Sequence, residues 1–354
     1  MSTEANDLSI SLYHEGVATI VERCSLEPAL GISPFSYGPT PVQMDPTSFR
    51  AFFSNPSFTR LRSYACFGMP SGGDSVLMEI ESSVGGPQPC TISYQTSGIS
   101  WQVWYDCILR GGMAILTAYL SVTNSTDVPY GPAGLRFVVP RGSGYHAFST
   151  QRPVSLRAAS TTHVELFTAS EIPVYSRTVA PADSTIVLDE LYLTNSDDCG
   201  LGMELPPGPI RVFQDGPPLL RIDGGTFPFA VPGDEITVRS VPSDDVMLHG
   251  GWNYETGIAN IHLHNQRAEA VTVQIEETEP ASEIEEASHP LHEDPSGGFR
   301  YFVVDVPARS TGRLSYRVSK AALERATPPG YQRPPGPAFT MQPVGSDLPN
   351  PHLA

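Results

Sequence analysis

Short runs of β-branched and aromatic residues recur along the chain about every ten to twelve residues, and Pro, Gly, Asn or Asp ends each run. This rhythm is typical of strands joined by turns. The 35 prolines and 31 glycines among 354 residues support the same interpretation, because both residue types interrupt helices. We therefore predict an all-β protein with two antiparallel β-sandwich domains of the immunoglobulin or jelly-roll kind.

The most aromatic of these runs lies between residues 91 and 109. Residues 91–96 and 100–109 flank a Ser-Gly break, so we predict that they form a central hairpin. Alternation places Trp101 and Trp104 on opposite faces of the second run. A strand with a large indole on each face is expected to lie between two packed layers. The pattern leaves open an alternative, in which Trp101, Trp104 and Trp252 line a carbohydrate-binding platform.

The composition changes near residue 200, where residues 195–200 (NSDDCG) are soon followed by the sequence PPGP. We place a domain boundary here. The prediction is an N-terminal sandwich over residues 1–200, with the hairpin 91–109 at its centre, and a C-terminal sandwich over residues 201–320. Residues 321–354 are too rich in proline and too poor in apolar alternation to form a core, so we expect an extended arm.

The arm is the predicted partner-binding segment, because proline-rich chains dock in the extended polyproline conformation. The expected partners are other protein subunits, either copies of this chain or the shell proteins of a particle. The residues predicted to bind them are Pro328, Pro329, Tyr331, Pro334, Pro335 and Phe339.

The formal net charge of −17 disfavours direct binding to nucleic acid or to anionic membranes. Lys320 is the single lysine among 21 basic residues, so lysine chemistry is excluded from nearly all of the chain. The arginine bias fits a GC-rich genome, and the alternative is frequent bidentate arginine pairs. The first residues lack a signal-peptide pattern and nowhere do 18 apolar residues run together. We expect synthesis in the cytoplasm without a signal peptide, and no membrane insertion.

His262 and His264 form the sharpest site-like pattern, because they alternate on a predicted strand and share one face. His249 or Glu255 could complete a metal site, although a solvated strand face is the simpler interpretation. The five cysteines are scattered, without a C-x-x-C pair, and are expected to be ordinary buried thiols. The glutamates of residues 276–286 are expected to form a solvated loop rather than a calcium site.

Nucleophile elbows and phosphate-binding glycine loops are absent from the sequence. Residues 142–146 (GSGYH) bring Ser143 and His146 close in sequence, but without the strand-to-helix turn that would expose a nucleophile. We therefore predict a protein that is not an enzyme and that has no cofactor.

Four segments of the first half resemble a known family: residues 13–18 (YHEGVA), 44–48 (MDPTS), 93–105 (SYQTSGISWQVWY) and 122–125 (VTNS). In the second half, residues 205–213 (LPPGPIRVF), 232–235 (PGDE) and 306–308 (VPA) follow the same order. Over roughly residues 8–320 the chain resembles the C-terminal domain of unknown function of mucoidy-inhibitor-A-type proteins. It lacks the N-terminal coiled-coil region of the longer members. The resemblance implies a pair of β-sandwiches and supplies no catalytic residues.

Together these patterns predict a structural or assembly protein, such as a capsid-decorating or spike component of a phage virion, which docks through its C-terminal arm. The alternative is a cellular binding module of the mucoidy-inhibitor type, acting in envelope or polysaccharide regulation. In the first case we expect the protein to be virion-associated.

Overall fold

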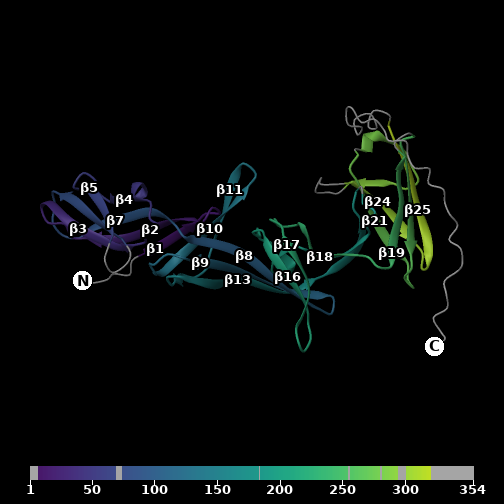
Figure 1. Cartoon of the computed structure of the whole chain (residues 1–354), viewed down its shortest axis with the longest axis horizontal. Coiled ribbons are helices and arrows are strands. Elements are labelled where there is room, and N and C mark those ends of the chain that lie inside the picture. Colours follow the sequence, from purple (N-terminus) through teal and green to yellow (C-terminus); the bar gives the residue numbers. More distant parts are fainter. Residues whose placement is uncertain are drawn as a thin grey trace, which may run out of the picture. The chain divides into compact units, whose positions relative to one another are not determined.

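A computed structural model of the chain describes residues 7–68, 74–182, 184–253, 256–279, 281–293 and 300–319 (Figure 1). These residues form strands β1 to β25 and three single-turn 3₁₀ helices, which confirms the all-β prediction. The chain folds into two compact units. The first unit holds the residues up to 177 together with residues 189–242, and the second holds residues 178–188 and those from 243 onward.

The first unit contains a seven-stranded sheet with the order β11-β10-β1-β2-β7-β4, to which β12 adds on β10. Its strands alternate buried apolar residues with more exposed ones. In β1, Ile10 and Leu12 are buried, and Ser11 between them is half-buried. The strand bounds are β1 (Asp7–Leu12), β2 (Val17–Leu26), β4 (Arg50–Phe53), β7 (Gln88–Ser97), β10 (Tyr130–Arg141), β11 (Gly144–Ser149) and β12 (Val154–Leu156). The turn at residues 14–16 joins β1 to β2 as an antiparallel hairpin.

A five-stranded sheet, β13-β9-β8-β16-β17, supplies the other half of the main core. Val103, Tyr105 and Leu116 from this sheet are buried in one cluster with Ile10 and Ile20 from the first sheet. The bounds are β8 (Ile99–Arg110), β9 (Met113–Asn124), β13 (Ser160–Pro173), β16 (Gly208–Gln214) and β17 (Leu220–Phe227).

Between β2 and β7 the chain forms an insert, which contains η1 (Pro46–Ser48), β4 and a three-stranded sheet of order β3-β6-β5. Val76, Met78 and Ile80 on the inner face of β6 join the main core. The three-stranded sheet consists of β3 (Gly31–Thr40), β5 (Thr59–Gly68) and β6 (Asp74–Ser82). The remaining elements of the first unit are β15 (Leu188–Thr194), η2 (Asp197–Cys199) and β18 (Glu235–Pro242).

The second unit holds β21, β24 and β23, which belong to a six-stranded sheet of order β18-β15-β14-β21-β24-β23, and a four-stranded sheet of order β19-β20-β25-β22. Val273, Phe302 and Leu314 are fully buried between them. The bounds are β14 (Tyr175–Ala180), β19 (Val246–Asn253), β20 (Ile258–Asn265), β21 (Val271–Glu277), η3 (Ala281–Glu283), β22 (Ile284–Ala287), β23 (Leu291–Glu293), β24 (Arg300–Val306) and β25 (Ser310–Val318).

The predicted central hairpin is wrong, although both of its strands exist. β7 pairs with β2 and β4, whereas β8 pairs with β9 and β16, so the two strands belong to different sheets. Gly98 turns the chain from one sheet to the other at a φ of +89°, where a Cβ would lie 3.2 Å from atoms of Ser125 and Thr126. The Ser-Gly break is therefore a corner of the sandwich.

The predicted domain boundary at residue 200 also differs from the structure. β16 pairs in parallel with β8, with Ile210 opposite Tyr105, and therefore belongs to the first unit. At Gly208 a Cβ would lie 2.2 Å from the carbonyl oxygen of Val103, so the two strands meet backbone to backbone. Parallel pairing also joins β1 to β10 and β14 to β21, which corrects the prediction of purely antiparallel sandwiches.

One strand order occurs twice along the chain. In the first repeat, β1 lies beside β2 and parallel to β10, and β9 lies between β8 and β13. In the second repeat, β14 lies beside β15 and parallel to β21, and β20 lies between β19 and β25. Both repeats are interrupted after their second strand, by β3–β6 and by β16–β17.

None of the helices in the described part of the chain has the length and apolar character needed to span a bilayer. The predicted arm, with its six predicted partner-binding residues, lies outside the described residues.

Candidate interaction surface

The outer face of the five-stranded sheet carries an aromatic and charged cluster around Trp104. The indole stacks on Tyr119 with ring centroids 4.3 Å apart, and the Arg211 guanidinium lies 4.0 Å from the Trp104 ring. Arg211 also donates two hydrogen bonds, of 2.7 and 2.9 Å, to the carboxylate of Asp106. This bidentate pair joins β16 to β8, which adds a charge-assisted bond to their backbone pairing.

Polar partners complete the cluster. The indole N–H of Trp104 donates to Ser121 Oγ at 2.8 Å, and Ser121 Oγ is 2.7 Å from His163 Nδ1. Tyr119 and Arg211 cover Trp104, so this indole does not offer an open stacking surface to a sugar ring. Trp101 packs inward against Phe137, with ring centroids 5.1 Å apart. These contacts favour the buried-scaffold interpretation of both indoles over the carbohydrate platform.

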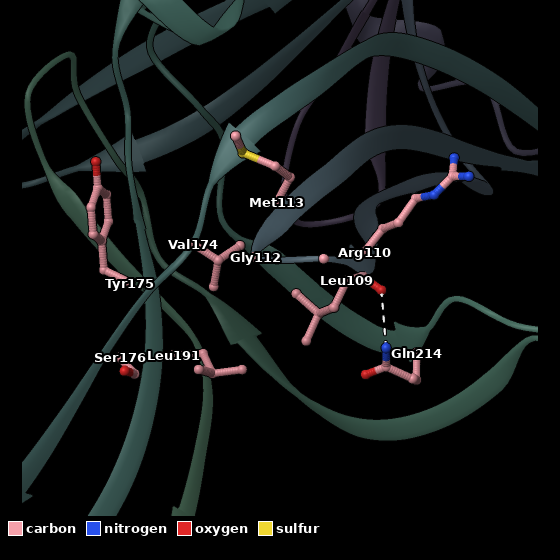
Figure 2. A pocket seen from close by; sticks show the side chains of 10 residues that line it. Leu109, Arg110, Gly112, Met113, Val174, Tyr175, Ser176, Leu191 and Gln214 are labelled. Carbon is pink, nitrogen blue, oxygen red and sulfur yellow. Dashed lines mark hydrogen bonds between the residues drawn. The ribbon is translucent and has the colours of Figure 1, made fainter.

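A hollow of about 280 Å³ lies within the first unit, where the turn between β8 and β9 approaches residues 174–176 (Figure 2). Leu109, Val174 and Leu191 gather at its centre, and Tyr175 and Met113 lie toward its edge. The charged lining residue Arg110 is ion-paired with Asp215 at 3.1 Å. The lining thus combines apolar side chains with one neutralised charge, and offers neither paired carboxylates nor a nucleophile with a base.

The structure places both predicted metal ligands, His262 and His264, on the outward face of β20. His249 on β19 lies directly opposite His262, and Arg313 on β25 lies opposite it on the other side. Within the described ranges, no group of three or more His, Cys, Asp or Glu side chains is close enough to hold a metal ion. Glu255 lies outside those ranges. The histidine row is therefore best described as an exposed strand face.

His146 is engaged in an ion-pair network rather than with Ser143. Its Nε2 lies 2.7 Å from a carboxylate oxygen of Glu204, whose other oxygen accepts from Arg141 at 2.9 Å. The Arg141 guanidinium also lies 4.6 Å from the ring centre of Phe229. This network fastens the turn between β10 and β11 to the loops that precede β16 and β18.

The predicted acidic loop is partly strand. Glu277 ends β21 and is 5% exposed, and burial raises the pKa of its carboxyl group. Tyr316 Oη donates to this carboxylate, and the Glu279 backbone N–H donates to it at 2.9 Å. Glu277 is therefore a structural carboxyl group within the second core. The alternation of Val271, Val273 and Ile275 before it was the signal that could have placed it in a strand.

Exposed apolar side chains concentrate in the insert of the first repeat. Among the described residues, seven of the fifteen large hydrophobic side chains that are exposed fall within residues 30–77: Leu30, Ile32, Val42, Phe52, Phe58, Phe67 and Leu77. Large exposed apolar residues that gather in one region mark interaction sites on soluble proteins.

Strand register shows how part of this set is arranged. On the outer face of the three-stranded sheet, Leu77 lies between Ser36 and Ala65, and Phe67 follows two residues after Ala65. We call these four residues the insert face. The other end of the same face is charged, where Arg60 pairs with Glu81 at 2.7 Å. An apolar centre beside a polar rim is the usual anatomy of a protein–protein contact.

Sequence reasoning did not identify the insert face. The sequence of β5 does not tell which of its sides is exposed, and that side became visible only with the pairing partners.

Comparison with known proteins adds no further assignment: a scan against protein-family models finds no match, and a search of curated proteins finds no relative.

Proposed function

We propose that this chain is a non-enzymatic structural or assembly protein that binds other protein subunits through the insert face. The observation that carries the proposal is the exposure of Phe67 and Leu77, at 45% and 41%, beside the small residues Ser36 and Ala65. Burying such side chains against a partner contributes roughly 25 cal/mol for each Å² of apolar area removed from water.

The environments of the reactive side chains support this class. His146 is bonded to Glu204, and Asp106 to Arg211, in pairs that join neighbouring elements of the fold. The edges of the three-stranded sheet carry features that hinder unregulated strand addition: Pro34 and Pro39 in β3, and a register shift between Leu61 and Ser63 in β5. We therefore propose side-chain docking on the insert face rather than extension of the sheet.

At a finer level, we propose a component of a larger particle, such as a decorating or spike protein of a phage virion, with the C-terminal arm as a second docking element. The strongly acidic composition and the proline-rich arm support this choice. The sequence resemblance favours a second candidate, a cellular binding module of the mucoidy-inhibitor type. Genes for capsid, portal or tail proteins beside this one would support the particle, and exopolysaccharide genes the alternative.

The test uses the full-length protein, expressed with a tag in the cells that naturally produce it and sized by gel filtration of the extract. The wild type is expected to elute well above monomer size, and Leu77→Asp at a smaller size than the wild type. Leu220→Asp is the matched control, because Leu220 is similarly exposed, at 52%, on β17. The same elution for wild type and Leu77→Asp would overturn the role of the insert face.

The arm is tested separately with a chain that ends at Lys320. If the arm docks, the truncated chain elutes at smaller size than the full-length chain, and the arm resists protease in the native extract. Equal elution together with rapid cleavage of the arm would remove it from the proposal and leave the insert face unaffected.

A further inference from the structure

Two of the free cysteines lie directly opposite each other on neighbouring strands. Cys24 on β2 is in register with Cys90 on β7, and both carry free thiols. Both belong to or pack against the main core, but Cys24 is partly exposed whereas Cys90 is buried. A small reagent can therefore reach one thiol of the pair.

The separation of the two residues follows from the backbone pattern. The Ser54 N–H donates to the carbonyl of Pro89 at 3.1 Å, so the backbone groups of Pro89 face β4. Those of Cys90 therefore face β2, which makes Cys24 and Cys90 a hydrogen-bonded pair with Cα atoms about 5.5 Å apart. That separation lies inside the range of about 4.4–6.8 Å found for disulfides.

The two thiols affect each other's ionisation. Hydrogen bonding from Cys90 lowers the pKa of the Cys24 thiol, while burial and the nearby Glu22 carboxylate oppose this effect. The same hydrogen bond and burial raise the pKa of Cys90. The partly exposed Cys24 is thus the better nucleophile, and the buried Cys90 is the resolving thiol.

We infer that Cys24 and Cys90 form a thiol–disulfide exchange site, which reacts with a low-molecular-weight disulfide such as glutathione disulfide. The Cys24 thiolate attacks one sulfur of the reagent, forms a mixed disulfide and releases one glutathione thiolate. Cys90 then loses its proton and attacks the Cys24 sulfur, which closes the Cys24–Cys90 bond and releases the second glutathione. Two protein thiols are oxidised and one reagent disulfide is reduced to two thiols.

The bond would close the loop of residues 25–89, which contains the entire insert. Cβ atoms in a hydrogen-bonded cross-strand pair lie up to about 5.5 Å apart, against about 3.5–4.5 Å in a disulfide. Closure must draw the two strands together locally, so the bond is strained and easily reduced. Easily reduced disulfides are the regulatory rather than the permanent kind.

The test incubates the folded full-length protein with glutathione disulfide, blocks the remaining thiols by alkylation and maps the peptides by mass spectrometry. The expected product in the wild type is a peptide pair joined through Cys24 and Cys90, which disappears on addition of reduced glutathione. In Cys90→Ser, Cys24 is expected to stop at the mixed disulfide. In Cys24→Ser, Cys90 is expected to remain alkylatable only after unfolding.

Cys66→Ser is the matched control, because Cys66 is also partly exposed on a strand but faces Val76 across the pair. It should form the Cys24–Cys90 bond as the wild type does. The proposal is overturned if wild type yields no joined peptides, or if Cys90→Ser accumulates no glutathione on Cys24. The peptide map of the wild type needs no substitution. It therefore tests the proposal even if a variant fails to fold.

Discussion

Each repeat contains a turn that is held by a buried asparagine, and we call this turn the corner of the repeat. The two repeats share their corners but differ in their outer faces. In the first repeat, buried Asn124 at the end of β9 donates to the carbonyls of Val128 and Arg157 and accepts from the Thr126 N–H. In the second repeat, buried Asn265 at the end of β20 donates to the carbonyls of Glu269 and Pro307. Asn265 also accepts from the Arg267 N–H at 2.9 Å. The same spacing of two and four residues separates each asparagine from its local partners.

The match extends to the strand that returns. Ala159 and Arg309, at φ values of 48° and 49°, immediately precede β13 and β25, and each donates its N–H to the carbonyl two residues beyond the asparagine. The outer faces differ instead. Counting from the buried asparagine, Trp104 in β8 corresponds to Gly251 in β19, and Tyr119 corresponds to Asn260, so the aromatic stack is not repeated at these positions. The corner maintains the fold, whereas the outer face can vary.

The largest expected effect lies where the insert of the second repeat joins the five-stranded sheet. Tyr105 is fully buried, stacks on Phe227 at 4.1 Å and donates to the Pro206 carbonyl at 2.5 Å. Tyr105→Ala should destabilise the first unit by about 4 kcal/mol, because it removes a large core side chain. Chemical denaturation measures this, with Tyr105→Phe as the control at about 1 kcal/mol. Similar costs for both variants would show that β16 is not packed as described.

The corners should respond alike. Asn124→Ala and Asn265→Ala each leave several buried backbone groups without partners, so each should cost its own unit about 3 kcal/mol. Native-state hydrogen exchange of peptides from β9 and β20 reports the two units separately. If one variant cost less than about 1 kcal/mol, the two corners would not be equivalent.

In the second repeat, β21 ends at the buried carboxyl group of Glu277. The corresponding strand of the first repeat, β10, buries only apolar and tyrosine side chains. Because the pKa of Glu277 is raised on folding, the folded state holds this proton more tightly than the unfolded chain. Its contribution is fully present below the unfolded pKa, about 4.3, and is lost as the pH rises through the folded pKa.

Glu277→Gln keeps the shape of the side chain without this ionisation. The wild type should therefore lose stability relative to Glu277→Gln as the pH rises from about 4 toward 7. Urea unfolding of the second unit at a series of pH values checks the sign. A stability difference that does not change with pH would show that burial of Glu277 is not costly.

The smallest effect concerns the outer faces themselves. A double-mutant cycle of Arg211→Ala and Asp106→Ala should give a coupling energy of about 1 kcal/mol, because the pair is bidentate and covered by Trp104. On the second repeat, Arg313 donates to Asn260 Oδ1 at 3.0 Å on an exposed face. The matching cycle should stay below about 0.5 kcal/mol. Equal values would remove the distinction between the faces.

The sequence was informative where alternation reports burial. The all-β class and the opposite faces of Trp101 and Trp104 could be predicted, because side chains alternate with a period of two. Partner choice could not be predicted. The pairing of β8 with β16 depends on contacts 105 residues apart, such as Arg211 with Asp106, and the run itself contains no trace of them.

The same reason explains the missed repeat and the missed surface. The sequence does not reveal that Asn124 and Asn265 are equivalent, because their shared role rests on carbonyls supplied by distant segments, as from Arg157 and Pro307. Leu77 alternates with buried neighbours as any sheet residue does. Its exposure could be known only after the opposite face of β6 had been assigned to the core.

We propose that the insert of the first repeat meets a partner, whereas the outer face of the second repeat does not. Hydrogen–deuterium exchange of the full-length chain, in its native assembly and after dissociation, tests this most directly. The account predicts that assembly slows exchange in β5 and β6 and leaves β19, β20 and β25 unchanged. Protection that appears on β19 and β20 and spares the insert would contradict it.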